Sequence, residues 1–191
     1  INVYGVTKLQ GENEIQKIHE KHLIFRTSWL YSSSSGNNFY RTMLKLFNEK
    51  PEVKVINDQV GNPTSIEFLA QAIFEILLSL KKDTEERWGL YHLSGSESMS
   101  WFAFAKEIYS NEGGQDSFKT KKIIPISSSE FASKVNRPSY SALNCDKIQN
   151  KFGDIYKKNY FNKNKGKKTT KTLYLIYFHF LKLVMPVLIL L

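Results

Sequence analysis

Two observations predict that the chain is a globular protein with an α/β fold. Its hydrophobic periodicity alternates between helical and extended segments from the first residue to about residue 152, and no internal repeat is visible. Its composition, 41% hydrophobic, 14% aromatic and 24% charged over 191 residues, suits one globular domain better than a disordered chain. The single cysteine, Cys145, excludes a disulfide scaffold and a cysteine-rich zinc module, and we expect a buried, inert thiol in a reducing compartment.

The first elements are a helix, a strand and a second helix. Residues 3–20 have the apolar spacing of a helix, and residues 22–27 follow as a short, mostly buried strand. After a serine-rich loop, Asn38 is placed to cap a helix. That helix carries apolar residues at helical spacing: Phe39, Met43, Leu44 and Phe47.

The alternation of strands and helices continues in the middle of the chain. Residues 53–57 form a strand candidate, and residues 58–64 must turn. Thr64 and Glu67 have the spacing of a capping box at the start of a helix over residues 68–80. This helix is apolar nearly all round, which predicts deep packing.

Three further elements complete the alternating pattern. Residues 88–93 are a strand candidate, and Ser100 can cap a helix over residues 101–109. Residues 123–126 form a last short strand, and residues 146–152 a short closing helix.

The net charge of +9 comes from the end of the chain. Residues 157–191 hold eight lysines and no acidic residue, which leaves 19 basic against 18 acidic residues, a net of +1, in residues 1–156. Because the globular part is nearly neutral, we expect no nucleic-acid partner.

The chain therefore divides into a domain over residues 1–156, a lysine-rich linker over 157–171 and an apolar tail over 172–191. Twenty residues of helix cover about 30 Å, the thickness of the hydrocarbon layer. Lys182 and Pro186 oppose insertion. A membrane segment and a terminus that is not native to the domain both stay open for this tail.

Tyr4 and Lys8 are the first candidates for chemistry. Four residues apart on a helix, their side chains share one face. An ammonium within about 4–6 Å favours the phenolate form of a tyrosine, which can then exchange a proton with a carbonyl or alcohol oxygen. The spacing alone does not establish this role, because a tyrosine packed over a lysine stem has the same spacing.

Five motifs in matching order carry a family resemblance: VYGVTKLQGE at 3–12, FRTSWLY at 25–31, GNNF at 36–39, VINDQVGNPT at 55–64 and GLYHL at 89–93. Over about residues 2–155 the chain resembles the dTDP-4-dehydrorhamnose reductases, extended members of the short-chain dehydrogenase/reductase superfamily. The resemblance implies the C-terminal part of a Rossmann-type, doubly wound parallel sheet with a small substrate-binding lobe. It also implies a cytoplasmic enzyme of dTDP-L-rhamnose synthesis, a nucleotide-sugar pathway for cell-surface polysaccharide.

The resemblance implies roles for five residues near the reaction. Tyr4 would protonate the C4 oxygen of a dTDP-4-keto-6-deoxysugar while NADPH or NADH delivers hydride to C4. Lys8 would assist Tyr4 and hydrogen-bond the nicotinamide ribose. Thr27 and Ser28 would run beside the nicotinamide, and Trp29 would pack on the sugar ring, although an indole that fills the lobe interface is an alternative. The choice between NADH and NADPH stays open.

The resemblance also implies a binding site for the nucleotide part of the substrate. Asn37, Asn38 and Phe39 resemble the stretch that holds the pyrophosphate at a helix N-terminus, although capping alone also explains Asn38. Arg137, in an Arg-Pro pair, resembles an arginine near the nucleotide-sugar, and its guanidinium suits phosphate. Gln59 and Thr64 lie in a loop that matches a family motif and are weaker neighbours of the site, although capping alone also explains Thr64.

No metal site is predicted, because the four histidines are scattered. Some family members use a glutamate at the position of Glu67 in a magnesium-bridged dimer contact. Capping explains Glu67 more simply, and Gln71 stands nearby where an acidic partner would be needed, so magnesium is not supported. A homodimer is expected only for the full-length parent.

Two family features have no counterpart in the sequence: a Ser or Thr on an earlier strand, and the glycine-rich dinucleotide loop. We therefore expect the C-terminal portion of a reductase with little activity by itself. Two alternatives stay open, another nucleotide-sugar epimerase or dehydratase, and a non-catalytic reductase-like regulatory subunit.

Overall fold

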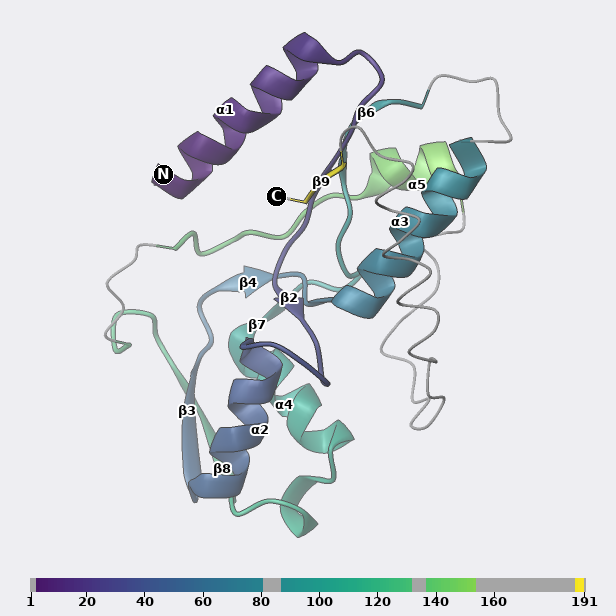
Figure 1. The fold of residues 1–191 in the computed structure, drawn as a ribbon. Helices are drawn as coiled ribbons and strands as arrows, with labels where there is room; N and C mark the ends of the chain where they lie inside the picture. Colours follow the sequence, from purple (N-terminus) through teal and green to yellow (C-terminus); the bar gives the residue numbers. More distant parts are fainter. Residues whose placement is uncertain (1–2, 81–86, 132–136, 154–187, 191) are drawn as a thin grey trace. The chain divides into compact units, whose positions relative to one another are not determined.

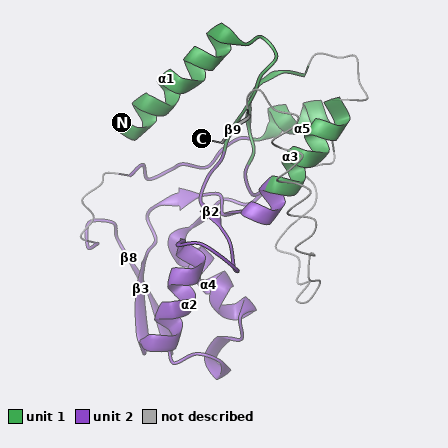
Figure 2. Cartoon of the chain, in the orientation of Figure 1, with its two compact units in different colours: residues 1–26, 70–93, 145–191 green, residues 27–69, 94–144 purple. Residues whose placement is uncertain are grey.

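Helices and strands alternate along the chain as the periodicity predicts (Figure 1). The computed structural model describes residues 3–80, 87–131, 137–153 and 188–190. The chain divides into two units (Figure 2). Unit 1 holds residues 1–26, 70–93 and 145–191, and unit 2 holds residues 27–69 and 94–144.

Unit 1 is built on a parallel sheet. Strand β1 (Leu23–Arg26) lies between β6 (Gly89–His92) and β9 (Leu188–Leu190), and both pairings are parallel. The first three residues of β1 are all buried, as expected for a central strand of a parallel sheet. The predicted strands at 22–27 and 88–93 are confirmed, each one residue shorter at both ends.

Three aromatic rings lie in the core of unit 1 beside its buried aliphatic side chains. The ring of Tyr91 on β6 lies 6.4 Å from that of Phe25 on β1 and 5.4 Å from that of Phe152. Phe152 ends helix α5 (Asp146–Phe152), which matches the predicted helix. Cys145, just before α5, is buried, as expected.

Helix α1 (Val3–Ile18) is the predicted first helix, two residues shorter than expected at its C-terminal end. Its one buried residue is Glu12. The apolar side chains of Leu9 and Ile18 are exposed instead of packed. A buried carboxylate, and not an apolar stripe, therefore fixes this helix within the described part of the chain.

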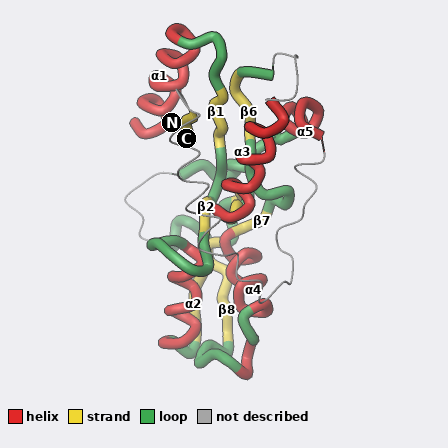
Figure 3. Tube along the Cα trace, turned by 45° about the vertical axis from the view of Figure 1, so that its right-hand side comes forward, coloured by secondary structure: helices red, strands yellow, loops and turns green. Residues whose placement is uncertain are grey.

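Unit 2 contains a parallel strand pair with two helices. Strand β3 (Glu52–Ile56) pairs in parallel with β8 (Lys122–Ile126), from Glu52 opposite Lys122 to Ile56 opposite Ile126. Helices α2 (Phe39–Glu49) and α4 (Trp101–Asn111) contact each other and β3 (Figure 3). Burial alternates along β3, which is the pattern of a strand with one face on a core.

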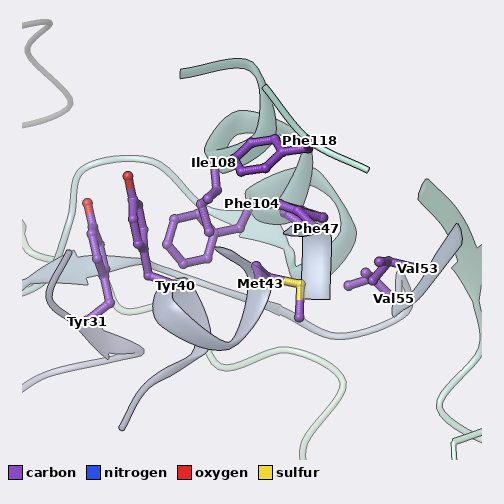
Figure 4. Close-up of a cluster of buried hydrophobic side chains, with 10 residues drawn as sticks. Tyr31, Tyr40, Met43, Phe47, Val53, Val55, Phe104, Ile108 and Phe118 are labelled. Atoms are coloured by element: carbon purple, nitrogen blue, oxygen red, sulfur yellow. The ribbon is translucent and has the colours of Figure 1, made fainter. Parts of the chain in front are cut away.

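The core of unit 2 joins these elements in one cluster (Figure 4). Tyr31 and Tyr40 stack with ring centroids 5.4 Å apart, and the hydroxyl of Tyr40 donates to Glu112 at 2.7 Å. Burial raises the pKa of both tyrosines above the ordinary value, so both are neutral donors. The buried members are Tyr31, Tyr40, Met43, Phe47, Val53, Val55, Phe104, Ala105, Ile108 and Phe118.

Short strand pairs complete unit 2. Strand β2 (Leu30–Tyr31) pairs in parallel with β5 (Thr64–Ser65), and β4 (Val60–Gly61) pairs antiparallel with β7 (Met99–Ser100). A single 3₁₀ turn, η1 (Gly114–Asp116), follows α4.

The N-terminal caps of helices α2, α3 and α4 test the predicted caps directly. Asn38 accepts from the backbone N–H of Arg41, and Ser100 from that of Ala103, so both predicted caps are confirmed. The capping box at Thr64 and Glu67 is wrong. Helix α3 (Ile66–Leu80) is capped by Ser65, whose hydroxyl accepts from the N–H of Phe68 at 3.0 Å.

The two residues of the predicted capping box, Thr64 and Glu67, hydrogen-bond to residues outside helix α3. The hydroxyl of Thr64 donates to the carbonyl of Asn62 and accepts from the N–H of Gly95. Glu67 accepts a hydrogen bond from Ser32 at 3.0 Å. The buried residues on α3 include Phe68, Leu69, Ala72, Ile73, Ile76 and Leu77, which confirms its deep packing.

The linker and most of the tail, residues 157–187, lie outside the described residues. Residues 188–190 of the tail are described as β9. Among the helices in the described ranges, none combines the length and apolar character needed to cross a bilayer.

Candidate functional site

Unit 2 contains a pocket of about 850 Å³, a size typical of small-molecule sites. Its walls come from the loop before β2, helix α2, strand β3, the start of α4 and the segment after β8. The lining residues are Trp29, Leu30, Phe39, Thr42, Met43, Leu46, Lys54, Val55, Ile56, Gln59, Trp101, Ser128, Ser129, Phe131 and Arg137.

Three aromatic rings form an apolar wall of this pocket. Trp29 and Trp101 stack with ring centroids 3.4 Å apart and planes 5° apart. Phe39 lies 4.5 Å from Trp101 at a tilt of 42°. Ser100 positions Trp101, because its hydroxyl caps α4 and also donates to Asn57 at 2.7 Å. The wall suits a flat or apolar ring.

The backbone at Trp29 is unusual. Its φ of 45° lies in the left-handed region, which side chains rarely adopt, and its carbonyl accepts from the N–H of Thr64 at 3.1 Å. Gly61 approaches the indole closely: a Cβ there would lie 2.5 Å from Nε1 and 2.8 Å from Cζ2 of Trp29, and nearer still to Cε2. Only glycine fits beside this ring.

Cations and hydroxyl groups share the pocket with the aromatic wall. Lys54 and Arg137 are its two basic residues. Ser128 is fixed by Asp58, whose carboxylate accepts from the Ser128 N–H and hydroxyl at 2.9 Å. These hydrogen bonds, the backbone one first, lower the pKa of Asp58 below its ordinary value. Positive charge beside an apolar wall suits an anionic ligand that carries a ring.

The structure brings together three of the predicted substrate-binding residues, Trp29, Phe39 and Arg137, from distant parts of the sequence. Asn37 and Asn38 do not line the pocket. Asn38 caps α2, and its amide donates to the carbonyls of Ser32 and Ser35, at 3.0 Å each.

Tyr4 and Lys8 lie on α1, in unit 1, and share one face. The Lys8 Nζ atom is 5.5 Å from the centroid of the Tyr4 ring. Tyr4 is 65% exposed, so its phenol is open to a ligand. The same face carries Glu12, whose carboxylate accepts from Arg26 at 2.7 and 2.6 Å. These hydrogen bonds raise the pKa of Arg26, which keeps its charge.

Thr27 and Ser28 follow β1 at its carboxyl end, where ligands of α/β proteins bind. The hydroxyl oxygen of Thr27 is buried and has no hydrogen-bond partner among the described residues. Ser28 accepts from the N–H of Asn62 at 3.4 Å. A buried hydroxyl without a partner is unfavourable, and a polar ligand group at this edge would satisfy it.

Among the lining residues that the sequence did not predict are Trp101, Lys54 and Ser128. In the sequence, Trp101 has the pattern of a core residue on an amphipathic helix. The only feature that distinguishes it from other core positions is that it directly follows a capping serine. Lys54 reads as the outward position of a strand, and Ser128 as part of a polar loop. Among the described residues, no three His, Cys, Asp or Glu side chains are grouped as metal ligands are.

Parallel strands joined through helices, with a second unit that carries a pocket, define an α/β protein of the Rossmann type with a ligand-binding lobe. The family follows from comparison with known proteins. The chain belongs to the RmlD substrate binding domain family, whose model matches residues 1–163.

The family match agrees with individual relatives. The chain is 40% identical over 155 residues to a dTDP-4-dehydrorhamnose reductase of Escherichia coli K12, covering 80% of this chain and 50% of that protein. The chain thus spans about half the length of the curated relatives it matches. The resemblance read from the motifs is confirmed.

Solved structures agree as well. A dTDP-4-dehydrorhamnose reductase of Clostridium acetobutylicum matches with a TM-score of 0.70 and 35% identity over 82% of this chain and 52% of that one. A reductase of Bacillus anthracis, solved with NADP, matches with a TM-score of 0.66 and 33% identity over 84% and 56%. The expected fold class is confirmed.

Proposed function

We propose that this chain supplies the proton donor and the substrate pocket of a dTDP-4-dehydrorhamnose reductase. The reaction is reduction of the C4 ketone of dTDP-4-dehydro-L-rhamnose to dTDP-L-rhamnose. The observation that carries the proposal is the pocket in which Trp29, Phe39 and Arg137 meet. The name of the Escherichia coli relative supports the substrate class.

Tyr4 acts as the general acid. When the C4 ketone is reduced, its oxygen gains negative charge and takes the proton of the Tyr4 phenol. The Lys8 ammonium, close to the same ring, stabilises the phenolate that is left. The exposure of Tyr4 leaves this phenol accessible to a sugar ketone.

A nicotinamide cofactor, when bound, supplies the hydride for C4. The described residues fit such a group in one respect: Thr27 offers a buried hydroxyl without a partner at the carboxyl end of β1. We assign to Thr27, Ser28 and Lys8 the polar contacts with the nicotinamide nucleotide. The NADP in the Bacillus anthracis structure supports this cofactor class.

The pocket of unit 2 holds the nucleotide-sugar. Arg137 and Lys54 bind the diphosphate, because both cations share the pocket with the aromatic wall. Asn37 and Asn38 support this site through the N-terminus of α2, with Asn38 acting as its cap.

We further propose that residues 1–156 form the reductase part, followed by the linker and the tail. The presence of a single cysteine in the sequence favours a cytoplasmic location, and a homodimer belongs to the full-length form. Comparing the solubility and mass in solution of residues 1–156 and 1–191 tests the tail. Equal solubility of two monomeric forms without detergent would contradict a membrane anchor.

The proposal is tested first by ligand binding, since we expect turnover of this chain by itself to be low. Calorimetry should detect dTDP binding, and Arg137→Met should weaken it roughly tenfold or more. Lys45→Met is the control, because Lys45 is an exposed cation farther along α2 and does not line the pocket. Absence of dTDP binding by the unmodified chain would refute the substrate assignment.

A second test concerns the proton donor. In a full-length reductase that contains this chain, Tyr4→Phe should abolish formation of dTDP-L-rhamnose from dTDP-4-dehydro-L-rhamnose and NADPH, and it should leave dTDP affinity unchanged. Formation of the 4-epimer instead of the reduced sugar would indicate an epimerase.

A further inference from the structure

The indole of Trp29 occupies a flat slot in the pocket of unit 2. One face of the ring lies on Trp101, with centroids 3.4 Å apart and nearly parallel planes. Gly61 covers the ring as well. A Cβ on Gly61 would be nearer to Cε2 of the indole than to Nε1 and Cζ2, the two atoms bonded to Cε2. An atom at the outer edge of the ring would be nearer to Nε1 or Cζ2, so this Cβ would lie above the face of the ring.

Trp101 therefore covers one face of the indole, and Gly61 lies over the ring at Cε2, which restricts the access of a ligand to Trp29. This differs from the expectation that Trp29 packs on the sugar ring. The ring of Trp29 must move before a ligand can stack on the face of Trp101 that the indole covers.

The backbone of Trp29 is strained in the present conformation, which lowers the cost of such a movement. A φ of 45° places a bulky residue in the left-handed region, and strain of this kind collects at ligand clamps and switches. A change of φ at Trp29 that carries the indole out of the slot would release this strain. The departure leaves the face of Trp101 open to the pocket that Lys54 and Arg137 also line.

We propose that Trp101 is the base-stacking residue of this pocket and that Trp29 is a displaceable occupant of its slot. On binding of a thymidine nucleotide, the thymine ring replaces the indole between Trp101 and Gly61. A planar base fits a slot with flat sides better than a puckered sugar ring does. The inference rests on the proposed function, since it assumes that the pocket takes a dTDP ligand.

Circular dichroism tests the exchange directly. Two stacked indoles couple and give paired bands of opposite sign in the far ultraviolet. The chain has three tryptophans, so Trp29→Phe or Trp101→Phe should remove this couplet and Trp88→Phe should keep it. Saturating thymidine or dTDP should also remove it, whereas L-rhamnose should not.

The outcomes separate this inference from the proposed function. A couplet that persists while calorimetry shows dTDP bound overturns the exchange and leaves the proposed function intact. Loss of the couplet with L-rhamnose but not with thymidine overturns the assignment of the slot to the base. Absence of any dTDP binding overturns both proposals.

Affinities give an independent test. Trp29→Ala empties the slot and should tighten thymidine binding several-fold, whereas Trp101→Ala removes the stacking face and should weaken it roughly tenfold. Trp88→Phe, a substitution outside unit 2, should leave affinity unchanged. Weaker thymidine binding in both Trp29→Ala and Trp101→Ala would show that Trp29 is itself a binding surface, and would overturn displacement.

Discussion

The guanidinium of Arg26 donates two hydrogen bonds, of 2.7 and 2.6 Å, to the carboxylate of Glu12. This pair ties α1 to β1, and Glu12 is 3% exposed. Tyr4, Lys8 and Glu12 follow one another at four-residue spacing, so they share a helix face. The pair therefore also sets the rotation of the face that carries Tyr4 and Lys8.

Replacing Glu12 should destabilise unit 1. Glu12→Gln removes the charge that faces Arg26, and we expect a loss of about 1–3 kcal/mol, less than for a fully buried pair because the Arg26 side chain is 39% exposed. Thermal denaturation measures it. Glu14→Gln breaks the exposed pair with Lys17 and should cost less than about 0.5 kcal/mol. Equal effects of the two variants would contradict an anchoring role for Glu12.

Thr64 is a second buried polar anchor. Thr64→Val keeps the shape but leaves the Gly95 N–H and the Asn62 carbonyl without their side-chain partner, so we expect a loss of about 1–3 kcal/mol in the free energy of unfolding. Thr7→Val, on the exposed face of α1, is the control. If chemical denaturation gives the same midpoint for Thr64→Val and the unmodified chain, the hydroxyl is not an anchor.

Gly95 and Gly11 should respond in opposite directions to alanine. A Cβ at Gly95 would collide with the backbone carbonyl oxygen of Pro63, which has little freedom to move, so Gly95→Ala should cost about 1–3 kcal/mol. At Gly11, inside α1, a Cβ meets nothing within 4 Å, and Gly11→Ala should add about 0.5–1 kcal/mol. Thermal midpoints that move together would refute this packing.

The loop at Ser128 should respond to acid. The pKa of Asp58 is lowered because its charged form accepts the Ser128 hydrogen bonds. These hydrogen bonds therefore stabilise the loop fully above the ordinary pKa range of aspartate. The stabilisation is lost as the pH falls through the lowered pKa. The amide shift of Ser128 in an NMR titration should therefore change with a midpoint below about 3.9. Asp58→Asn should remove the inflection, and a midpoint at or above that value would contradict the contact.

The sequence predicted local structure well where neighbouring residues decide it. The caps at Asn38 and Ser100 were correct because each depends on a side chain and an N–H three residues away. The predicted capping box was wrong because the Thr64 hydroxyl has another hydrogen-bond partner. This hydroxyl reaches the backbone of Gly95, 31 residues away, and leaves the cap to Ser65.

The pocket, too, was predicted only in part from the sequence. Its predicted members Trp29, Phe39 and Arg137 came from the family resemblance, whereas Trp101 and Lys54 were not predicted. Trp101 reads as an ordinary apolar position on a helix, and only its distance from Trp29 in space gives it a role.

By itself the sequence determined the alternation of helices and strands, the family, and the shared face of Tyr4 and Lys8, because these follow from residue types at short, fixed spacing. The tertiary structure alone decided which side chains line the pocket and that Trp29 fills the slot between Trp101 and Gly61. Such contacts join residues that are distant along the chain, and the packing of the whole unit selects among them.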